Sequence, residues 1–502
     1  MTTFNLLNEP WIGCIDDGGG HVDLSIPDVL LMAPSLLGLD VDTPMEELAT
    51  FRLLLAFAQR CLRQGEAPLG PADREEWNEL WTVGVFSRDA IEAEVDRVFD
   101  LFDLFDSERP FMQDASLPTN APTTIAVLDH GLASGNNKLL RDRTLDAEPP
   151  AFSPVRAVRA MLSYFACSPC GAMTFIERGD GGVSLRGGAG GPGSPFYSAA
   201  AVILRGKNLF STLCLNMIPY DDRSRYQLET DLPAWERGTN ELGSVRIPSG
   251  ILDIFSWPTR AIRLLPEEGL VVRRIVLANG DRIDPEAGIQ DPMVSYQHID
   301  KVGVVPVGIR EDEQTWRNIS ALLAPQQRVE GRWTGRPRTL RVAYENYQED
   351  LPILNVDVIG AIFKNSASFI LWRRDAFPLS PSLLGSDQAF SRLQLASDIL
   401  SHTESALYRA MSRFRGTQDL VKTVRSVCQS RFWEEARMPF LRLVAAGPTE
   451  GEIERFIRRV RVVAYHCLRE TIADRAGLME VARLESALTR NLANKSSSRR
   501  KQ

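Results

Sequence analysis

The feature that most constrains the fold is the helical residue pattern in the last quarter of the chain. Four long stretches carry apolar residues at helical spacing, and breaks near Gly416, Gly447-Pro448 and Gly477 separate them. Four helices of this length with short connections are typical of an up-and-down bundle. The expected helices span residues 388–415, 418–446, 450–471 and 478–493.

Charge also separates this helical part from the rest. Residues 376–502 contain 21 Lys and Arg against 13 Asp and Glu, whereas residues 1–375 have a net charge of −16. Such an asymmetry favours a surface that faces a polyanion. A salt-bridged exterior is the alternative that charge alone leaves open, but the excess of basic residues favours nucleic acid. The basic residues at helical spacing are Arg409, Arg413, Lys422, Arg425, Arg455, Arg458 and Arg459.

The preceding part of the chain predicts a mixed α and β domain. Thr43-Pro44, with Glu46 closing a capping box, and Ser153-Pro154 each begin a helix. Between about residues 179 and 346, Gly, Pro and short β-prone runs predict an irregular, partly antiparallel sheet with long loops. The predicted strands are 4–12, 21–26, 200–204, 261–265, 271–277 and 340–343. The fold class is therefore α+β: a mixed α/β domain at 1–377, followed by a four-helix bundle at 378–502.

Composition excludes several classes of protein. No apolar run reaches the roughly 18 to 20 residues of a membrane helix, and the first residues lack the features of a signal peptide. Seven cysteines, an odd number spread thinly, argue against a disulfide framework. We expect a cytoplasmic protein without a membrane partner.

Residues suited to catalysis or metal binding show no ligand spacing. Cys167 and Cys170 form a CxxC pair, but a zinc site needs two further ligands and no second CxxC exists. A structural thiol pair beside a helix end is favoured. We expect no cofactor and no catalytic residue, with a CxxC-dependent metalloprotein or nuclease as the alternative. The five histidines are at 21, 130, 298, 402 and 466.

Three polar segments have the composition of ligand-contacting loops. The glycine-rich stretch 179–193 lacks GxxxxGK[ST], so a phosphate-binding loop is not supported. It is either a flexible solvent loop or a loop that closely approaches another backbone or DNA. The segment 134–138, Ser-Gly-Asn-Asn-Lys, suits phosphate and base-edge contacts, or is an ordinary turn. The segment 363–368 is a predicted hairpin tip, which either wedges into a duplex or faces solvent.

Several separated motifs together resemble one family, the large subunit CasA of the type I-E CRISPR Cascade surveillance complex. Their order and spacing cover nearly the whole chain. They include Phe-Asn-Leu-Leu-Asn-Glu-Pro-Trp-Ile at 4–12, Arg-Pro-Phe-Met-Gln at 109–113, Ser-Gly-Asn-Asn at 134–137, Arg-Gly-Lys-Asn-Leu-Phe-Ser-Thr-Leu-Cys-Leu-Asn at 205–216, Phe-Ser-Trp-Pro at 255–258, Asp-Pro-Met-Val-Ser-Tyr at 291–296 and the stretch 363–375.

The resemblance implies a binding and scaffolding subunit without catalysis. Its expected partners are the 5′ handle of the guide RNA, double-stranded target DNA, the other Cascade subunits and a helicase–nuclease that it helps to recruit. It is expected to recognise the protospacer-adjacent motif and to promote strand separation, while base pairing reads the sequence.

The resemblance also assigns residues to these contacts. The loop that contacts the RNA handle falls on Ser134, Gly135, Asn136, Asn137 and Lys138, with Arg141 in place of a family aromatic as a phosphate contact. The glycine loop that meets DNA falls on Gly181, Gly182, Gly187 and Gly188, with Arg186 beside them.

Two further DNA elements follow from the same resemblance. The cation that enters the minor groove falls on Arg273 or Arg274, and the wedge falls on Lys364, Asn365, Ser366 and Ala367. Because minor-groove reading is degenerate, we expect permissive motif recognition. Unstacking one base step costs a few kcal/mol, which contacts from the bundle to the displaced strand offset in part. The bundle residues assigned to DNA are Arg409, Arg413, Arg455, Arg458 and Arg459.

Overall fold

The computed structural model describes most of the chain and divides it into two compact units. The first comprises Met1–Thr315, Gln326–Glu349 and Asn355–Ala376, and the second Trp316–Pro325, Asp350–Leu354 and Phe377–Gln502. The division into domains at residue 377 stays a prediction. The described residues are 3–62, 73–134, 147–179, 182–191, 193–219, 231–238, 242–311, 313–347, 353–364 and 368–493.

The first strand of the first unit begins later than predicted, whereas the second begins at His21 as expected. Residues 4–11 form turns in which the backbone N–H groups of Asn8 and Glu9 both donate to the Asn5 carbonyl, so the strand expected at 4–12 is wrong. The antiparallel sheet that follows has the order β2-β1-β3. Its strands are β1 (Ile12–Asp16), β2 (His21–Leu24) and β3 (Leu36–Leu39).

The centre of the first unit is the predicted helix α2 (Pro44–Cys61), which is buried along almost its whole length. Thr43 caps it by accepting the backbone N–H of Glu46 at 3.2 Å. The helix α5 (Pro154–Ala166) packs against it and begins with the predicted Ser153 cap. The other helices of this unit are α1 (Ile26–Met32), α3 (Arg74–Val83), α4 (Arg88–Val98), α6 (Leu209–Asn216), α7 (Ala234–Arg237), α8 (Ile251–Phe255) and α10 (Arg338–Tyr347).

The strand expected at 340–343 is wrong, because these residues lie in α10. The buried residues Thr339, Leu340, Ala343 and Asn346 recur at helical rather than alternating spacing. Short β-prone runs do not distinguish a strand from a buried helix, and here packing against α6 decided the outcome.

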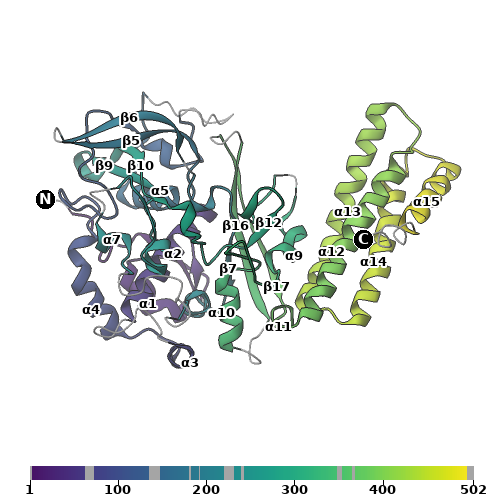
Figure 1. Ribbon diagram of the computed structural model, residues 1–502, viewed down its shortest axis with the longest axis horizontal. Coiled ribbons are helices and arrows are strands. Elements are labelled where there is room, and N and C mark those ends of the chain that lie inside the picture. The colour runs from purple at the N-terminus through teal and green to yellow at the C-terminus, as the bar shows by residue number, and fades with distance from the viewer. Residues whose placement is uncertain are drawn as a thin grey trace. The chain divides into compact units, whose positions relative to one another are not determined.

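The irregular, partly antiparallel sheet predicted for the middle of the chain is present as several small sheets. One has the order β4-β10-β9 and another the order β17-β16-β7, with the hairpin β5-β6 separate (Figure 1). These strands are β4 (Thr123–Thr124), β5 (Gly171–Gly179), β6 (Gly182–Gly191), β7 (Ala201–Arg205), β9 (Arg260–Pro266), β10 (Val272–Asn279), β16 (Leu354–Lys364) and β17 (Ser368–Leu379). Three further two-stranded sheets lie in the described part of the chain. The parallel one pairs β8 (Val245–Arg246) with β11 (Arg282–Ile283), and the antiparallel ones pair β12 (Tyr296–Ile299) with β13 (Gly303–Pro306) and β14 (Gln327–Val329) with β15 (Arg332–Thr334).

The second unit is built around the four predicted helices (Figure 1). They are α12 (Asp387–Met411), α13 (Gln418–Ala446), α14 (Glu450–Ile472) and α15 (Leu478–Ala493), preceded by α9 (Ile319–Leu322) and α11 (Ser382–Gly385). Ser386, Thr417 and Thr449 cap three of the long helices, the last in a full capping box with Glu452. Trp316 joins this unit by packing on Trp433 and Phe440, with ring centroids 5.7 and 5.5 Å apart. Within the described part of the chain, no helix is long and apolar enough to cross a membrane.

Candidate nucleic-acid interface

The glycine-rich stretch is a strand rather than a loop in its described part. Residues Gly182–Gly191 pair antiparallel with β5, so the expected loop is corrected to a hairpin arm. Ile176 of β5 and Leu185 of β6 lie opposite each other and pack on a small core that includes Val276 of β10. The backbone ladder joins the two arms of the hairpin, and this apolar face packs it against β10.

The opposite face of the hairpin carries the predicted DNA-binding arginine. Because side chains alternate along a strand, Glu177 and Arg186 point away from the face that Ile176 and Leu185 bury. Both are exposed and form an ion pair at 2.8 Å. Packing explains why position 188 is a glycine, because a Cβ there would lie 2.6 Å from the ring of Phe175. Gly182 and Gly187 are exposed, and Gly181 lies outside the described residues.

Arg273 lies at a bulge in β10. The register of β10 against β9 shifts between Val272 and Arg274, and a bulge of this kind redirects a side chain. The Arg273 side chain is 45% exposed, contacts Glu267 at 3.4 Å and donates to the carbonyl of Pro149 at 3.0 Å. Arg274 is half-buried and pairs by its backbone with Thr124 and Leu265. Arg273 is therefore the more accessible of the two candidate cations.

The C-terminal flank of the predicted RNA loop runs beside this bulge. Phe152 exchanges two backbone hydrogen bonds of 2.9 Å with Val272. Arg156 then joins the two flanks of the loop, because it lies 4.0 Å over the Phe152 ring and forms a 2.8 Å ion pair with Asp129. Ser134 is half-buried, whereas Gly135, Asn136, Asn137, Lys138 and Arg141 lie outside the described residues.

The N-terminal flank of the same loop packs under the predicted wedge hairpin. His130 stacks on Phe369 of β17 at 5.4 Å and meets Phe363 of β16 edge-on at 5.3 Å. Its Nε2 lies 2.7 Å from the Cys167 carbonyl oxygen. Burial lowers the pKa of His130, so this ring is neutral at physiological pH. Lys364 is exposed at the end of β16, and Asn365, Ser366 and Ala367 lie outside the described residues.

The bundle arginines are solvent-exposed, as a surface that contacts nucleic acid requires. Arg455, Arg458 and Arg459 share one face of α14. Neither these three nor Arg409 and Arg413 form an ion pair with a described residue. Two glutamates of the same helix are engaged elsewhere: Glu452 forms a hydrogen bond with Thr449, and Glu470 approaches Arg431 at 3.6 Å. The other two exposed arginines, both near the end of α12, are Arg409 and Arg413.

The CxxC pair lies beside a helix end. Cys167 caps α5, is fully buried and directs its Sγ toward the Phe196 carbonyl oxygen at 3.6 Å; burial raises the pKa of its thiol. Cys170 is half-buried. Among the residues that the structure describes, no group of three His, Cys, Asp or Glu side chains is arranged to hold a metal ion.

Two basic residues were missed by sequence reasoning. Arg156 connects the flanks of the RNA loop, and Arg178 of β5 anchors the glycine hairpin through a 2.8 Å ion pair with Asp114. The ion-pair partners of both are distant in sequence, so no local pattern marks them. The only local signal is the place of Arg156 in the first turn of a capped helix.

Comparison with known proteins places the chain in a family. The sequence profile of CRISPR-associated protein Cse1 matches residues 5–465. A CasA/Cse1 protein of Thermus thermophilus is 30% identical over an alignment of 500 residues. The match covers 94% of this chain and 93% of the relative. The chain belongs to the Cse1 family.

Solved structures agree with this membership. Cse1 of Acidimicrobium ferrooxidans is 26% identical with a TM-score of 0.79, and the match covers 98% of both chains. Cse1 of Thermobifida fusca shares the fold at 22% identity, with a TM-score of 0.82 over 98% of this chain and 97% of that one. A chain of a CRISPR RNA-guided surveillance complex also shares the fold, at 20% identity and a TM-score of 0.78, over 98% of this chain and all of that one. The predicted family and fold class are thus confirmed.

Proposed function

We propose that this Cse1-family chain is the non-catalytic large subunit of a cytoplasmic CRISPR RNA-guided surveillance complex. It contacts the 5′ handle of the guide RNA and the other Cascade subunits, and recognises the protospacer-adjacent motif in double-stranded DNA. It then promotes strand separation and helps to recruit a helicase–nuclease. Membership of the family and its likeness to a chain of a surveillance complex support this assignment.

The observation that carries the proposal is the convergence of three predicted segments on one part of the first unit. The glycine hairpin packs on β10, and the bulge at Arg273 lies on the same strand. The flanks of the RNA loop reach β10 at Phe152 and the base of the wedge hairpin at His130. Segments far apart in sequence therefore lie on one part of the first unit, which supports a common role in binding the guide RNA and the duplex.

A division of labour follows from charge and exposure. Arg273 serves as the minor-groove cation, since a cation is attracted to the negative potential of a narrow groove. Lys364 and the hairpin tip serve as the wedge, and Arg186 holds a phosphate once the exposed Glu177 releases it. The exposed bundle arginines hold the displaced strand through contacts that weaken with salt.

The test uses the complete complex reconstituted on its guide RNA, with and without this chain. Affinity for duplexes with and without the motif is measured by fluorescence anisotropy at fixed salt. We expect motif-dependent binding with the chain, and a loss of about tenfold with Arg273→Gln. Equal affinity and equal motif dependence with and without the chain would contradict the proposal.

The control variant is Arg88→Gln, which changes net charge by the same amount. Arg88 is exposed on α4 and pairs with Glu92 one turn away, at 3.4 Å. It should bind the motif like the unmodified chain. If charge reversal at Arg273, Arg274 and Lys364 has no more effect than Arg88→Gln, the chain is a structural adaptor that does not touch DNA.

A further inference from the structure

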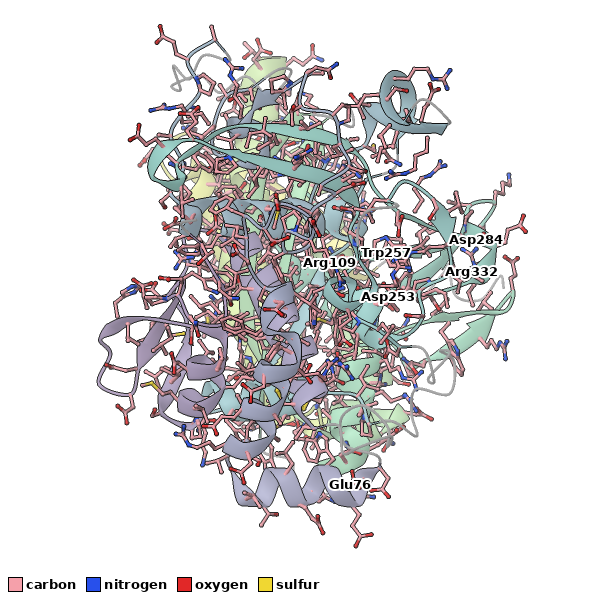
Figure 2. All side chains as sticks on the ribbon, turned by 90° about the vertical axis from the view of Figure 1, so that its left-hand side faces the viewer. Glu76, Arg109, Asp253, Trp257, Asp284 and Arg332 are labelled. Carbon is pink, nitrogen blue, oxygen red and sulfur yellow. The ribbon has the colours of Figure 1, made fainter. Side chains whose placement is uncertain are left out.

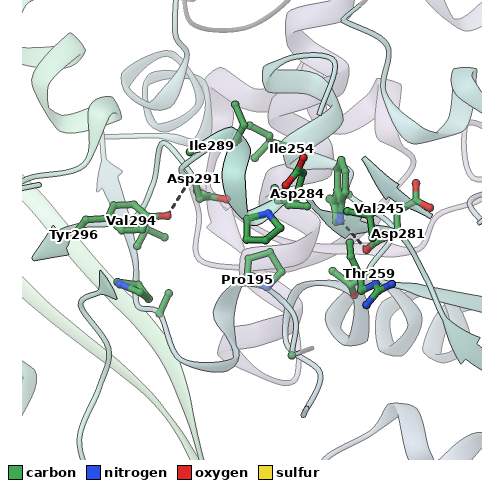
Figure 3. Close-up of a pocket in the computed structure, with 18 of the residues that line it drawn as sticks. Pro195, Val245, Ile254, Thr259, Asp281, Asp284, Ile289, Asp291, Val294 and Tyr296 are labelled. Carbon is green, nitrogen blue, oxygen red and sulfur yellow. Dashed lines mark hydrogen bonds between the residues drawn. The ribbon is translucent and has the colours of Figure 1, made fainter. Parts of the chain in front are cut away.

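A pocket in the first unit contains none of the residues assigned above to RNA or DNA. Its volume is about 500 Å³, within the range of small-molecule sites. Figure 3 shows Tyr296 and Val294 on one side, Asp281 and Thr259 on the other, and Pro195 between them. The pocket is thus walled by segments from several small sheets rather than by one element.

Arginines outside the pocket lining neutralise two of its three carboxylates. Asp281 accepts from Arg246 Nε at 2.5 Å and from Arg237 Nη2 at 2.9 Å. Asp291 is paired with Arg52 at 2.8 Å. None of these three arginines lines the pocket, so the carboxylates contribute structure to the wall and little net charge to the cavity.

The remaining charged groups give the cavity a positive balance. Three arginines line it. Arg260 is buried and donates to the carbonyls of Thr259 and Pro169, whereas Arg282 and Arg332 form no ion pair with any described residue. Asp284 is the one unneutralised carboxylate of the lining as described. The Nε of Arg282 is buried without a hydrogen-bond partner in the described part of the chain. Arg332 donates to the Pro285 carbonyl at 2.5 Å, which fixes it beside Asp284 (Figure 2).

No described residue forms a hydrogen bond with the guanidinium of Arg282, which leaves its terminal nitrogens able to donate to a ligand in the cavity. An anionic acceptor is favoured, because the lining contains three arginines and one carboxylate that no arginine neutralises. Arginine suits phosphate oxygens in particular, since its fork of donors matches them.

The rest of the wall is apolar and suits a flat ring. Ile254, Ile289 and Val294 contribute aliphatic surface, and Tyr296 an aromatic face whose hydroxyl accepts the backbone N–H of Asp291 at 2.9 Å. Such walls bury the ring of a ligand, while a few polar groups fix its orientation.

We propose that this pocket binds a nucleotide. Arg282 and Arg332 hold its phosphate, the apolar wall holds its base, and Asp284 accepts a hydrogen bond from a ribose hydroxyl or a base amino group. The nucleotide is either free or one unstacked residue of a bound strand. The proposal is independent of the function proposed above, since no pocket residue belongs to the predicted RNA or DNA contacts.

The experiment uses the full chain, with AMP as the free probe and a short single-stranded oligonucleotide that ends in the same nucleotide as the second. Isothermal titration calorimetry compares the unmodified chain, Arg282→Gln and the charge-matched control Arg88→Gln. Losing a charge-assisted hydrogen bond should weaken binding at least about tenfold in Arg282→Gln and leave the control unchanged.

A second variant separates loss of binding from loss of folding. Ile289→Trp adds bulk to the cavity wall without changing charge, and circular dichroism reports whether either variant is folded. If both folded variants bind AMP more weakly than the unmodified chain does, the pocket is a site for free nucleotides. If the variants weaken binding of the oligonucleotide alone, the pocket is a site for one residue of a strand. Absence of binding by both probes, or equal binding by a folded pocket variant and Arg88→Gln, overturns the proposal.

Discussion

Glu46 shows how the surroundings of one residue change its chemistry. Its position in the first turn of α2 predicts a capping box, and its backbone N–H does donate to Thr43. The Oε2 atom, however, is buried without a hydrogen-bond partner among the described residues. Burial, with a contribution from the charge of Asp42, raises the pKa of Glu46 to about 7.

The raised pKa of Glu46 predicts a pH dependence of stability. Between pH 4.5 and about 7 the folded state retains a proton that the unfolded state has released. Stability therefore falls as pH rises through this interval. We expect Glu46→Gln to exceed the unmodified chain in free energy of unfolding by on the order of 1–3 kcal/mol at pH 8, and to match it near pH 4. Urea unfolding at both pH values checks this, and an equal difference at both would contradict it.

At the scale of elements, the β5–β6 hairpin depends on one anchoring ion pair. Asp114 is fully buried and accepts from Arg178, which is 32% exposed. Arg178 also donates to Ser116 Oγ at 2.9 Å. Removing the arginine leaves a buried carboxylate without its cation, which is the costly way to break such a pair.

We therefore expect Arg178→Met to destabilise the first unit by about 1–3 kcal/mol. Amide hydrogen exchange in Gly171–Gly179 should accelerate, because the hairpin loses its attachment. Arg186→Met on the same hairpin is the matched control: its pair with Glu177 is exposed and worth about 0–1 kcal/mol. Equal exchange in the two variants would show that the anchor is unimportant.

The end of α13 offers a second test at this scale. Gly447 has φ +75°, and a Cβ there would lie 2.0 Å from Ser382 Oγ. Gly447→Ala should destabilise the second unit by about 2–4 kcal/mol through backbone strain and overpacking. Gly451→Ala should be neutral or stabilise by up to about 1 kcal/mol, since it lies within α14 and a Cβ there meets nothing. Thermal unfolding of both variants decides the point.

At the scale of the whole molecule, charge asymmetry predicts how DNA binding responds to salt. The triple variant Arg455→Gln, Arg458→Gln, Arg459→Gln removes three exposed arginines without ion pairs among the described residues. If they hold the displaced strand, the slope of log affinity against log salt concentration should fall by about 2. The measurement is binding of the assembled complex to target DNA across a salt series.

The control for this prediction alters three arginines of the same unit that are already paired. Arg431, Arg469 and Arg483 form ion pairs with Glu470, Glu485 and Glu480. Substituting these three with glutamine changes net charge equally but should leave the slope nearly unchanged. A similar fall in both triple variants would attribute the effect to overall charge rather than to a strand-binding face.

The sequence by itself determined the helices of the second unit and the family of the chain. The predicted bounds 418–446 and 478–493 coincide with α13 and α15. Helix periodicity, caps and breakers are local, since each backbone bond joins residues four apart. Only at Ser412, which ends α12 before the predicted 415, did a local turn shorten a helix.

The tertiary structure alone decided what lies against what in the first unit. It placed 340–343 in a helix, paired the described part of the glycine stretch with β5, and brought Arg178 to Asp114 and Arg156 to Asp129. It also assembled the pocket around Arg282 from segments between Gly193 and Arg332. Strand pairing, ion pairs and cavities join residues distant in the chain, and no local pattern encodes such distant partners.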